Sequence, residues 1–130
     1  MNSTALACTA ALGLLLFALG LSVSILRSRV GVLSGYAPAP DQLLTKLVRA
    51  HGNTAEYAPF LAVLCLYLGS QHPNHWQLWC MVGATACRLL LVVALIAWPS
   101  MSKPNPARAV GALGTYAFGV ALCVALLNGH

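Results

Sequence analysis

The chain has 130 residues, of which 59% are hydrophobic and 7% are charged. Because soluble domains carry about 25% charged residues, this composition excludes an ordinary soluble globular domain. The net charge of +5 comes from basic residues that form no surface stripe, so we expect no nucleic-acid partner. Residues 1–130 are predicted to form a single all-α domain embedded in a membrane.

Four apolar stretches have about the 20 residues that a helix needs to cross a bilayer. They are Thr4–Leu26, Leu43–Leu68 with polar interruptions, Trp76–Trp98 with one arginine, and Ala109–Leu127. The first stretch lacks the basic start and the short apolar run of a cleavable signal peptide. The sequence therefore predicts an integral membrane protein with a four-transmembrane-helix bundle of up-down topology.

The basic residues predict the orientation of these spans. Six of them fall in or beside two of the three connections: Arg27, Arg29, Lys46, Arg49, Lys103 and Arg108. The second connection, SQHPNHWQ, contains no lysine or arginine. The positive-inside rule therefore places the first and third connections in the cytoplasm and both termini outside. For Arg27 and Lys46 we expect contacts with anionic lipid head groups.

Local signals mark helix ends and a kink. Asp41 is placed to cap the second helix or to favour its positive end. Asn105 is the expected N-cap of the fourth helix, with Pro106 as its first residue. Pro59 removes one backbone donor from the second helix, which predicts a kink there.

A stripe of small residues follows the fourth helix at i, i+4 spacing: Ala107, Gly111, Thr115, Gly119 and Cys123. Small residues permit close helix packing, either at an oligomer axis or within one subunit. The five cysteines are scattered, without a C-x-x-C pair or a histidine at ligand spacing. Neither a metal site nor a disulfide framework is predicted.

The second span contains a polar cluster in RAHGNTAEYAPF, with Arg49, His51, Asn53, Glu56, Tyr57 and Phe60. Arg49, Asn53, Glu56 and Phe60 step by four, three and four residues, so they share one helical face. Glu56 lies about 10 Å deeper than Arg49, where a carboxylate should face protein or a water-filled cavity. Arg88 lies at a comparable depth, which predicts a Glu56–Arg88 ion pair. Spacing alone does not separate a helix–helix contact from a ligand site.

Arginines outnumber acids in the predicted cytoplasmic half of the chain. Arg108 falls in the first turn of the fourth helix, where the positive helix end adds to its charge. Arginine binds carboxylates through two parallel hydrogen bonds. Arg49 and Arg108 therefore favour a ligand that carries carboxylates.

The motif R-A-H-G-N-x-x-E-Y-x-P, with four spans and a basic first loop, resembles the MAPEG family (membrane-associated proteins in eicosanoid and glutathione metabolism). The resemblance covers essentially the whole chain, including Arg27, Arg29, Arg88 and Arg108. It implies a homotrimer that binds glutathione as co-substrate between subunits near the cytosolic face. Members conjugate glutathione to lipophilic electrophiles, reduce lipid hydroperoxides or isomerise eicosanoid precursors. The short chain and its HGN motif resemble bacterial members, which favours detoxification at a bacterial inner membrane.

The resemblance also implies residue roles. One subunit would hold glutathione through Arg49, Asn53, Glu56 and Tyr57. The neighbouring subunit would approach it through Arg29, His51 and Arg108. A guanidinium beside the sulfur favours the thiolate, which is the nucleophile, and Arg108 is the candidate for this catalytic role.

The chain departs from the family at three positions. Leu91 and Leu95 stand where members often have ligand-facing His or Tyr, and Ala109 stands where some have serine. Fewer polar contacts imply weaker glutathione binding, another thiol ligand or lost catalysis. A silent thiol- or lipid-binding scaffold is therefore an alternative to the transferase or peroxidase. A small multidrug transporter is disfavoured, because the first helix has no charged residue before Arg27.

Overall fold

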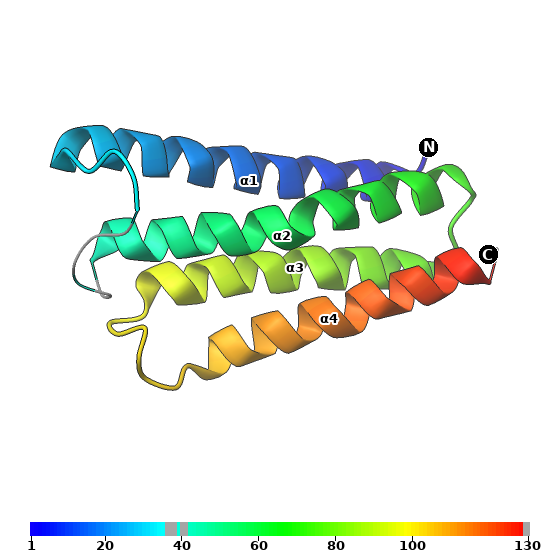
Figure 1. Cartoon of the computed structure of the whole chain (residues 1–130). Coiled ribbons are helices and arrows are strands. Elements are labelled where there is room, and N and C mark those ends of the chain that lie inside the picture. Colours follow the sequence, from blue (N-terminus) through cyan, green and yellow to red (C-terminus); the bar gives the residue numbers. More distant parts are fainter. Residues whose placement is uncertain (36–38, 40–41, 129–130) are drawn as a thin grey trace.

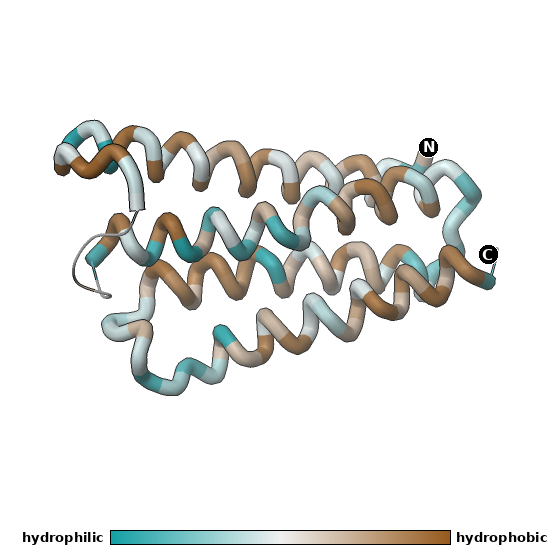
Figure 2. The backbone as a smooth tube through the Cα atoms, viewed as in Figure 1, coloured by the Kyte–Doolittle hydropathy of each residue, from teal (hydrophilic) through white to brown (hydrophobic). Residues whose placement is uncertain are grey.

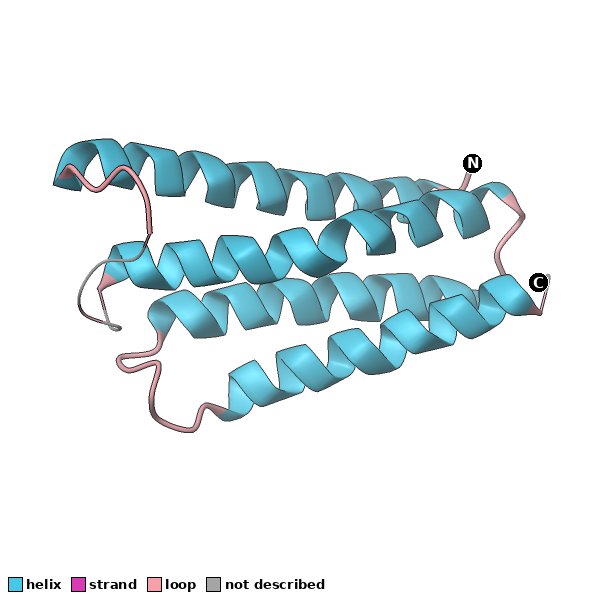
Figure 3. Cartoon of the chain, viewed as in Figure 1, coloured by secondary structure: helices cyan, strands magenta, loops and turns pink. Residues whose placement is uncertain are grey.

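The computed structural model describes residues 1–35, 39 and 42–128. Its helices are α1 (Ser3–Val30), α2 (Leu43–Ser70), α3 (His75–Ala97) and α4 (Pro106–Leu127). Successive helices run in opposite directions, so the start of α1 and the end of α4 lie at the same end of the bundle (Figure 1). Helices and loops account for the whole described part of the chain (Figure 3). The predicted all-α, up-down four-helix bundle is confirmed.

Three helices, α1, α3 and α4, are long and apolar enough to cross a membrane in the described part of the chain. The remaining helix, α2, is as long as α1, with 28 residues each, and lies beside α1 in the bundle (Figure 1). Lys46, Arg49 and Glu56 interrupt its apolar sequence. These polar positions gather in the first half of α2 (Figure 2).

The helix ends follow the local sequence. Asn105 caps α4 by accepting a hydrogen bond from the Arg108 backbone nitrogen, and Pro106 opens the helix, as predicted. The N-cap position of α2 is Gln42, whose side chain makes no capping hydrogen bond. The predicted cap, Asp41, lies outside the described residues. Pro59 lies inside α2, and the axis of this helix changes course in its middle part, as expected (Figure 1).

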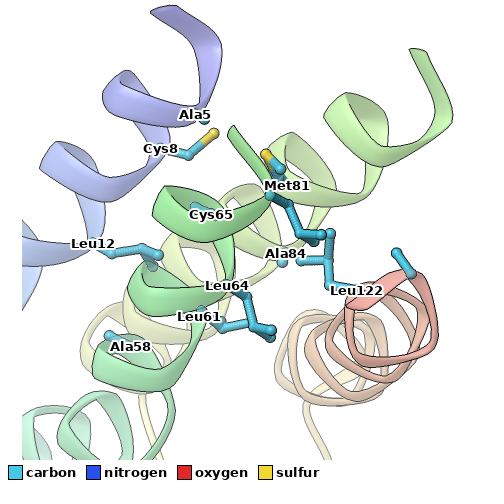
Figure 4. Packing of buried hydrophobic residues seen from close by; sticks show 12 residues of the cluster. Ala5, Cys8, Leu12, Ala58, Leu61, Leu64, Cys65, Met81, Ala84 and Leu122 are labelled. Atoms are coloured by element: carbon cyan, nitrogen blue, oxygen red, sulfur yellow. The ribbon is translucent and has the colours of Figure 1, made fainter. Parts of the chain in front are cut away.

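All four helices meet in one apolar cluster near the end of the bundle that holds the termini (Figure 4). Its members include Ala5 and Leu12 from α1, Leu64 from α2, Met81 from α3 and Leu122 from α4. A second cluster joins α1, α2 and α3 toward the opposite end. Because α4 contributes no fully buried residue to that cluster among the described positions, its first half packs mainly on α3.

Two members of the small-residue stripe of α4, Gly111 and Thr115, pack against α3 within the subunit. A Cβ added to Gly111 would lie 2.9 Å from the Cys87 carbonyl oxygen and 2.9 Å from the Leu91 Cβ, both on α3. The Thr115 hydroxyl on α4 accepts a hydrogen bond from Arg88 on α3. At Gly111 and Thr115 the structure therefore shows close packing between α3 and α4.

The predicted lipid contact of Lys46 is wrong. Only 8% of this residue is exposed, and its ammonium donates to the carbonyl oxygens of Trp98 at 2.7 Å and Pro99 at 3.3 Å. These carbonyls follow the last turn of α3, whose negative end favours a cation. Lys46 thus fastens the start of α2 to the end of α3.

Candidate functional site

The polar face of α2 lines a groove. Arg49, Asn53 and Glu56, together with Val48 and Gly52, surround a volume of about 210 Å³. Arg49 and Glu56 are exposed and Asn53 is half-buried. Of the four residues predicted to share one helical face, Arg49, Asn53 and Glu56 line this groove, whereas Phe60 does not.

Arg88 supports this groove from behind. Its side chain is 1% exposed, and its Nη1 donates to the Asn53 Oδ1 at 2.9 Å and to the Asn53 backbone oxygen at 3.1 Å. Its Nε donates to the Thr115 hydroxyl at 2.9 Å. The Tyr57 ring lies against the guanidinium, with 4.9 Å from its centroid to the Arg88 Cζ, a distance at which a cation and a ring attract.

This arrangement replaces the predicted Glu56–Arg88 ion pair. Within the described residues no salt bridge joins the two side chains, and the hydrogen bonds of Arg88 go to Asn53 and Thr115 instead. A buried charge is costly without such partners. Because the hydrogen bonds of Arg88 go to these two uncharged partners, the exposed Glu56 carboxylate stays available to a ligand.

The contact with Arg88 also orients Asn53. Its Oδ1 accepts from the guanidinium, which turns the amide nitrogen away from Arg88. An amide nitrogen has two N–H donors. Asn53 therefore presents hydrogen-bond donors beside Arg49, a combination suited to an anionic group.

A second, larger groove of about 480 Å³ lies between α2 and α4. Its lining is mostly apolar: Glu56, Tyr57, Phe60, Leu61, Leu64, Thr115, Tyr116, Gly119, Val120 and Cys123. Glu56 lines both grooves. The polar groove and the apolar groove are therefore contiguous along α2.

Two tyrosines meet at the junction of α2 and α4. The hydroxyl oxygens of Tyr57 and Tyr116 are 3.4 Å apart, and the ring centroids are 5.6 Å apart at an interplanar angle of 54°. The sequence analysis missed Tyr116. The signal that could have found it is the single tyrosine of a largely apolar fourth helix.

Three other expected site residues lie elsewhere in the single chain. Arg29 is exposed in the last turn of α1. His51 packs on α1, where its Nε2 would lie 3.1 Å from a Cβ added to Gly20. Arg108 is half-buried and its Nη1 donates to the Met101 carbonyl oxygen at 3.4 Å.

The structure therefore groups Arg49, Asn53, Glu56 and Tyr57 along α2. Arg29, His51 and Arg108 line neither of the two grooves. This division matches the two sets that the resemblance assigned to different subunits. Their joint role across an interface stays a prediction.

The leucines that replace family polar residues belong to the core. Leu91 and Leu95 are each 4% exposed and pack in the second apolar cluster with residues of α1 and α2. Ala109 is exposed in the first turn of α4. Arg88, through its hydrogen bonds to Asn53, is therefore the polar residue of α3 that contacts the lining of the polar groove.

Comparison with known proteins identifies one family. The model of the MAPEG family matches residues 5–128, nearly the entire chain. No curated protein and no solved structure matches the chain.

Proposed function

Because the chain belongs to the MAPEG family, we propose that it is an integral membrane, glutathione-dependent transferase or peroxidase that acts on lipophilic electrophiles or lipid hydroperoxides. The observation that carries this proposal is the pair of contiguous grooves along α2. One groove has the charges for a polar thiol. The other has the apolar lining for a lipophilic substrate, and Glu56 lies on both.

Glutathione fits the polar groove by its charges. The tripeptide carries two carboxylates and an amino group, and Arg49 suits a carboxylate because a guanidinium binds it in a bidentate manner. Glu56 accepts from the amino group. Asn53, held by Arg88, donates to the peptide or to a carboxylate, and Tyr57 closes the side toward the apolar groove.

Arg108 is the proposed activating residue, acting at the neighbouring subunit of a homotrimer. It lies in the first turn of α4, where the helix dipole adds positive potential. A guanidinium there favours the thiolate form of bound glutathione. Arg29 and His51 of that neighbour complete the contacts with the tripeptide. Cytoplasmic placement of the first and third connections in a bacterial inner membrane gives the site access to cytosolic glutathione.

A catalytically silent thiol- or lipid-binding scaffold is the second candidate. The core positions of Leu91 and Leu95 support it, since they remove two polar contacts that members of the family often have. Binding would survive through α2, whereas activation of the sulfur would be lost.

Purified protein in detergent micelles tests the proposal. We expect saturable glutathione binding, conjugation to 1-chloro-2,4-dinitrobenzene and glutathione-dependent reduction of cumene hydroperoxide. Arg49→Leu should weaken glutathione binding and thereby lower both activities, whereas Lys103→Leu, which removes an exposed charge outside both grooves, should change neither. Binding without turnover would support the scaffold. Absence of glutathione binding would contradict the transferase or peroxidase and would favour a silent scaffold for lipid or another thiol.

A further inference from the structure

Glu56 and Tyr57 on α2 and Thr115 and Tyr116 on α4 are the polar residues that line the apolar groove, and each pair is adjacent in sequence. The remaining lining is apolar apart from the Cys123 thiol. A groove of this size is in the range that holds small organic ligands. Its lining suits an elongated apolar body with one hydrogen-bonding head that meets the tyrosines.

Tyr116 is the donor best placed for that head. Thr115 is committed, because its hydroxyl donates to the Gly111 carbonyl oxygen at 2.7 Å and accepts from Arg88. An ionised Glu56 only accepts, and the Cys123 thiol is a weak donor. Among the described residues that line the groove, strong uncommitted hydroxyls therefore come from the tyrosine pair.

The two tyrosines have different roles. The Tyr57 ring rests on the Arg88 guanidinium and lies beside the polar groove, so its position is fixed. When Tyr57 donates to the Tyr116 oxygen across 3.4 Å, the Tyr116 proton is free to point at a ligand. A hydroxyl that accepts one hydrogen bond becomes a better donor in the next.

We propose that Tyr116 is a specificity-determining donor that selects substrates whose reacting oxygen becomes anionic: hydroperoxides and α,β-unsaturated carbonyl compounds. This inference rests on the proposed glutathione-dependent function. Aryl halides such as 1-chloro-2,4-dinitrobenzene gain less from Tyr116. The negative charge of their addition complex is spread over the ring and two nitro groups before it leaves with the halide, so no single oxygen becomes an alkoxide or enolate. Donors aimed at a developing oxyanion accelerate reactions by about 100-fold or more.

In the peroxidase reaction two glutathione thiols are oxidised to the disulfide and the hydroperoxide is reduced to an alcohol and water. The glutathione thiolate attacks the distal oxygen of the hydroperoxide, so an S–O bond forms, the O–O bond breaks and its electron pair stays on the alkoxide. Tyr116 gives its proton to the alkoxide, which leaves as the alcohol, and regains a proton from a second glutathione. That second thiolate attacks the glutathione sulfenic acid and forms the disulfide. The expelled hydroxide becomes water with the proton that the first thiol released.

Addition to an enone uses the same donor. The thiolate forms an S–C bond at the β-carbon, and the electron pair of the double bond moves to the carbonyl oxygen. Tyr116 hydrogen-bonds that enolate oxygen until the α-carbon takes a proton from water. The oxygen is then a neutral carbonyl again.

Two tyrosine variants test the assignment by turnover. Tyr116→Phe should lower kcat/KM for cumene hydroperoxide and for benzylideneacetone by about 100-fold and leave 1-chloro-2,4-dinitrobenzene within about twofold. Tyr67→Phe is the matched control, because this exposed tyrosine lies on α2 outside the groove. An equal loss with all three substrates, or no loss, overturns the proposal.

A second measurement needs neither glutathione nor turnover. Benzylideneacetone bound to wild type should show a lowered carbonyl stretching frequency in the infrared, and Tyr116→Phe should return it to the value seen in hydrocarbon solvent. An identical frequency in both proteins, or no binding of this enone by wild type, overturns the assignment of Tyr116. The proposed function itself fails separately, through absence of glutathione binding.

Discussion

Arg88 on α3 holds Asn53 on α2 through two hydrogen bonds, one to the side-chain oxygen at 2.9 Å and one to the backbone oxygen at 3.1 Å. The contact joins a buried charge to a residue of the polar groove. A change at Arg88 therefore alters the binding face of α2 as well as helix packing.

Removal of the Arg88 guanidinium should destabilise the protein through Asn53. Hydrogen bonds to charged groups contribute about 1.5–3 kcal/mol, so Arg88→Met should cost several kcal/mol. In a double-mutant cycle, Asn53→Ala and Arg88→Met should couple by about 0.5–3 kcal/mol. Glu56→Gln and Arg88→Met should couple less than that pair, because no hydrogen bond joins Glu56 to Arg88 in the described residues and only the attraction between their charges remains. Unfolding in detergent measures both cycles, and strong Glu56 coupling would restore the ion pair that the sequence suggested.

Lys46 should be a stability determinant despite its place near the membrane boundary. Lys46→Met removes a donor that is bonded to the carbonyls of Trp98 and Pro99 and leaves them without their charged partner. The expected cost is about 1.5–3 kcal/mol. Lys103→Met, which removes an exposed lysine, should change unfolding by less than about 0.5 kcal/mol. A head-group role for Lys46 would instead make its effect depend on anionic lipid.

The close approach of α3 and α4 should tolerate no side chain at Gly111. Its added Cβ would meet backbone atoms of Cys87 and Leu91 at 2.9 Å, so Gly111→Ala should cost about 1–3 kcal/mol through overpacking. A Cβ added to Gly13 on α1 would have no atom within 4 Å. Gly13→Ala should therefore stabilise the helix by up to about 1 kcal/mol. Similar melting temperatures for the two variants would refute the packing argument.

Local sequence predicted the start of α4, but it could not select the partner of Arg88. Asn105 and Pro106 act within one turn of α4, so their capping role depends on neighbours in the chain. Glu56 and Asn53 differ by three residues, or about 4.5 Å along the helix axis. Matching depths in the membrane cannot resolve that difference, because the rotation of α2 against α3 decides which side chain Arg88 meets.

Helix packing, which the local sequence does not reveal, also decides the contacts of Lys46 and Tyr116. Lys46 reaches carbonyls more than fifty residues away, and its burial depends on the third connection folding back over α2. Tyr116 became a candidate only when α4 placed it beside Tyr57. By contrast, the stripe of Arg49, Asn53 and Glu56 follows from helical periodicity alone, and the grooves contain it as expected.

The orientation in the membrane can be tested by labelling single cysteines placed at residues 2 and 103, in a background without the five native cysteines. Positive connections predict that residue 2 reacts from outside and residue 103 from the cytoplasm. Native mass spectrometry in detergent should give a trimer. Labelling of residue 2 from the cytoplasm would falsify the topology, and a monomeric mass would remove the shared site.

The last prediction concerns the thiol of bound glutathione. A free cysteine thiol has a pKa of about 8.5, so only a few per cent is thiolate at neutral pH. A guanidinium at the sulfur, aided by the positive end of α4, should lower the pKa of the bound thiol and produce thiolate absorbance near neutral pH. Arg108→Leu should abolish that absorbance and turnover while much of the binding remains, because other groups hold the carboxylates. Arg49→Leu and Glu56→Gln should weaken binding first.

The comparison between these variants separates activation from binding. If Arg108→Leu keeps its thiolate signal and its rate, Arg108 is not the activating group, and Arg29 of the neighbouring subunit becomes the better candidate. If wild type binds glutathione but shows neither absorbance nor turnover, the scaffold is the correct function. Burial of Leu91 and Leu95 in the apolar core then supplies the reason, since no polar group of α3 beyond Arg88 would be left to activate the sulfur.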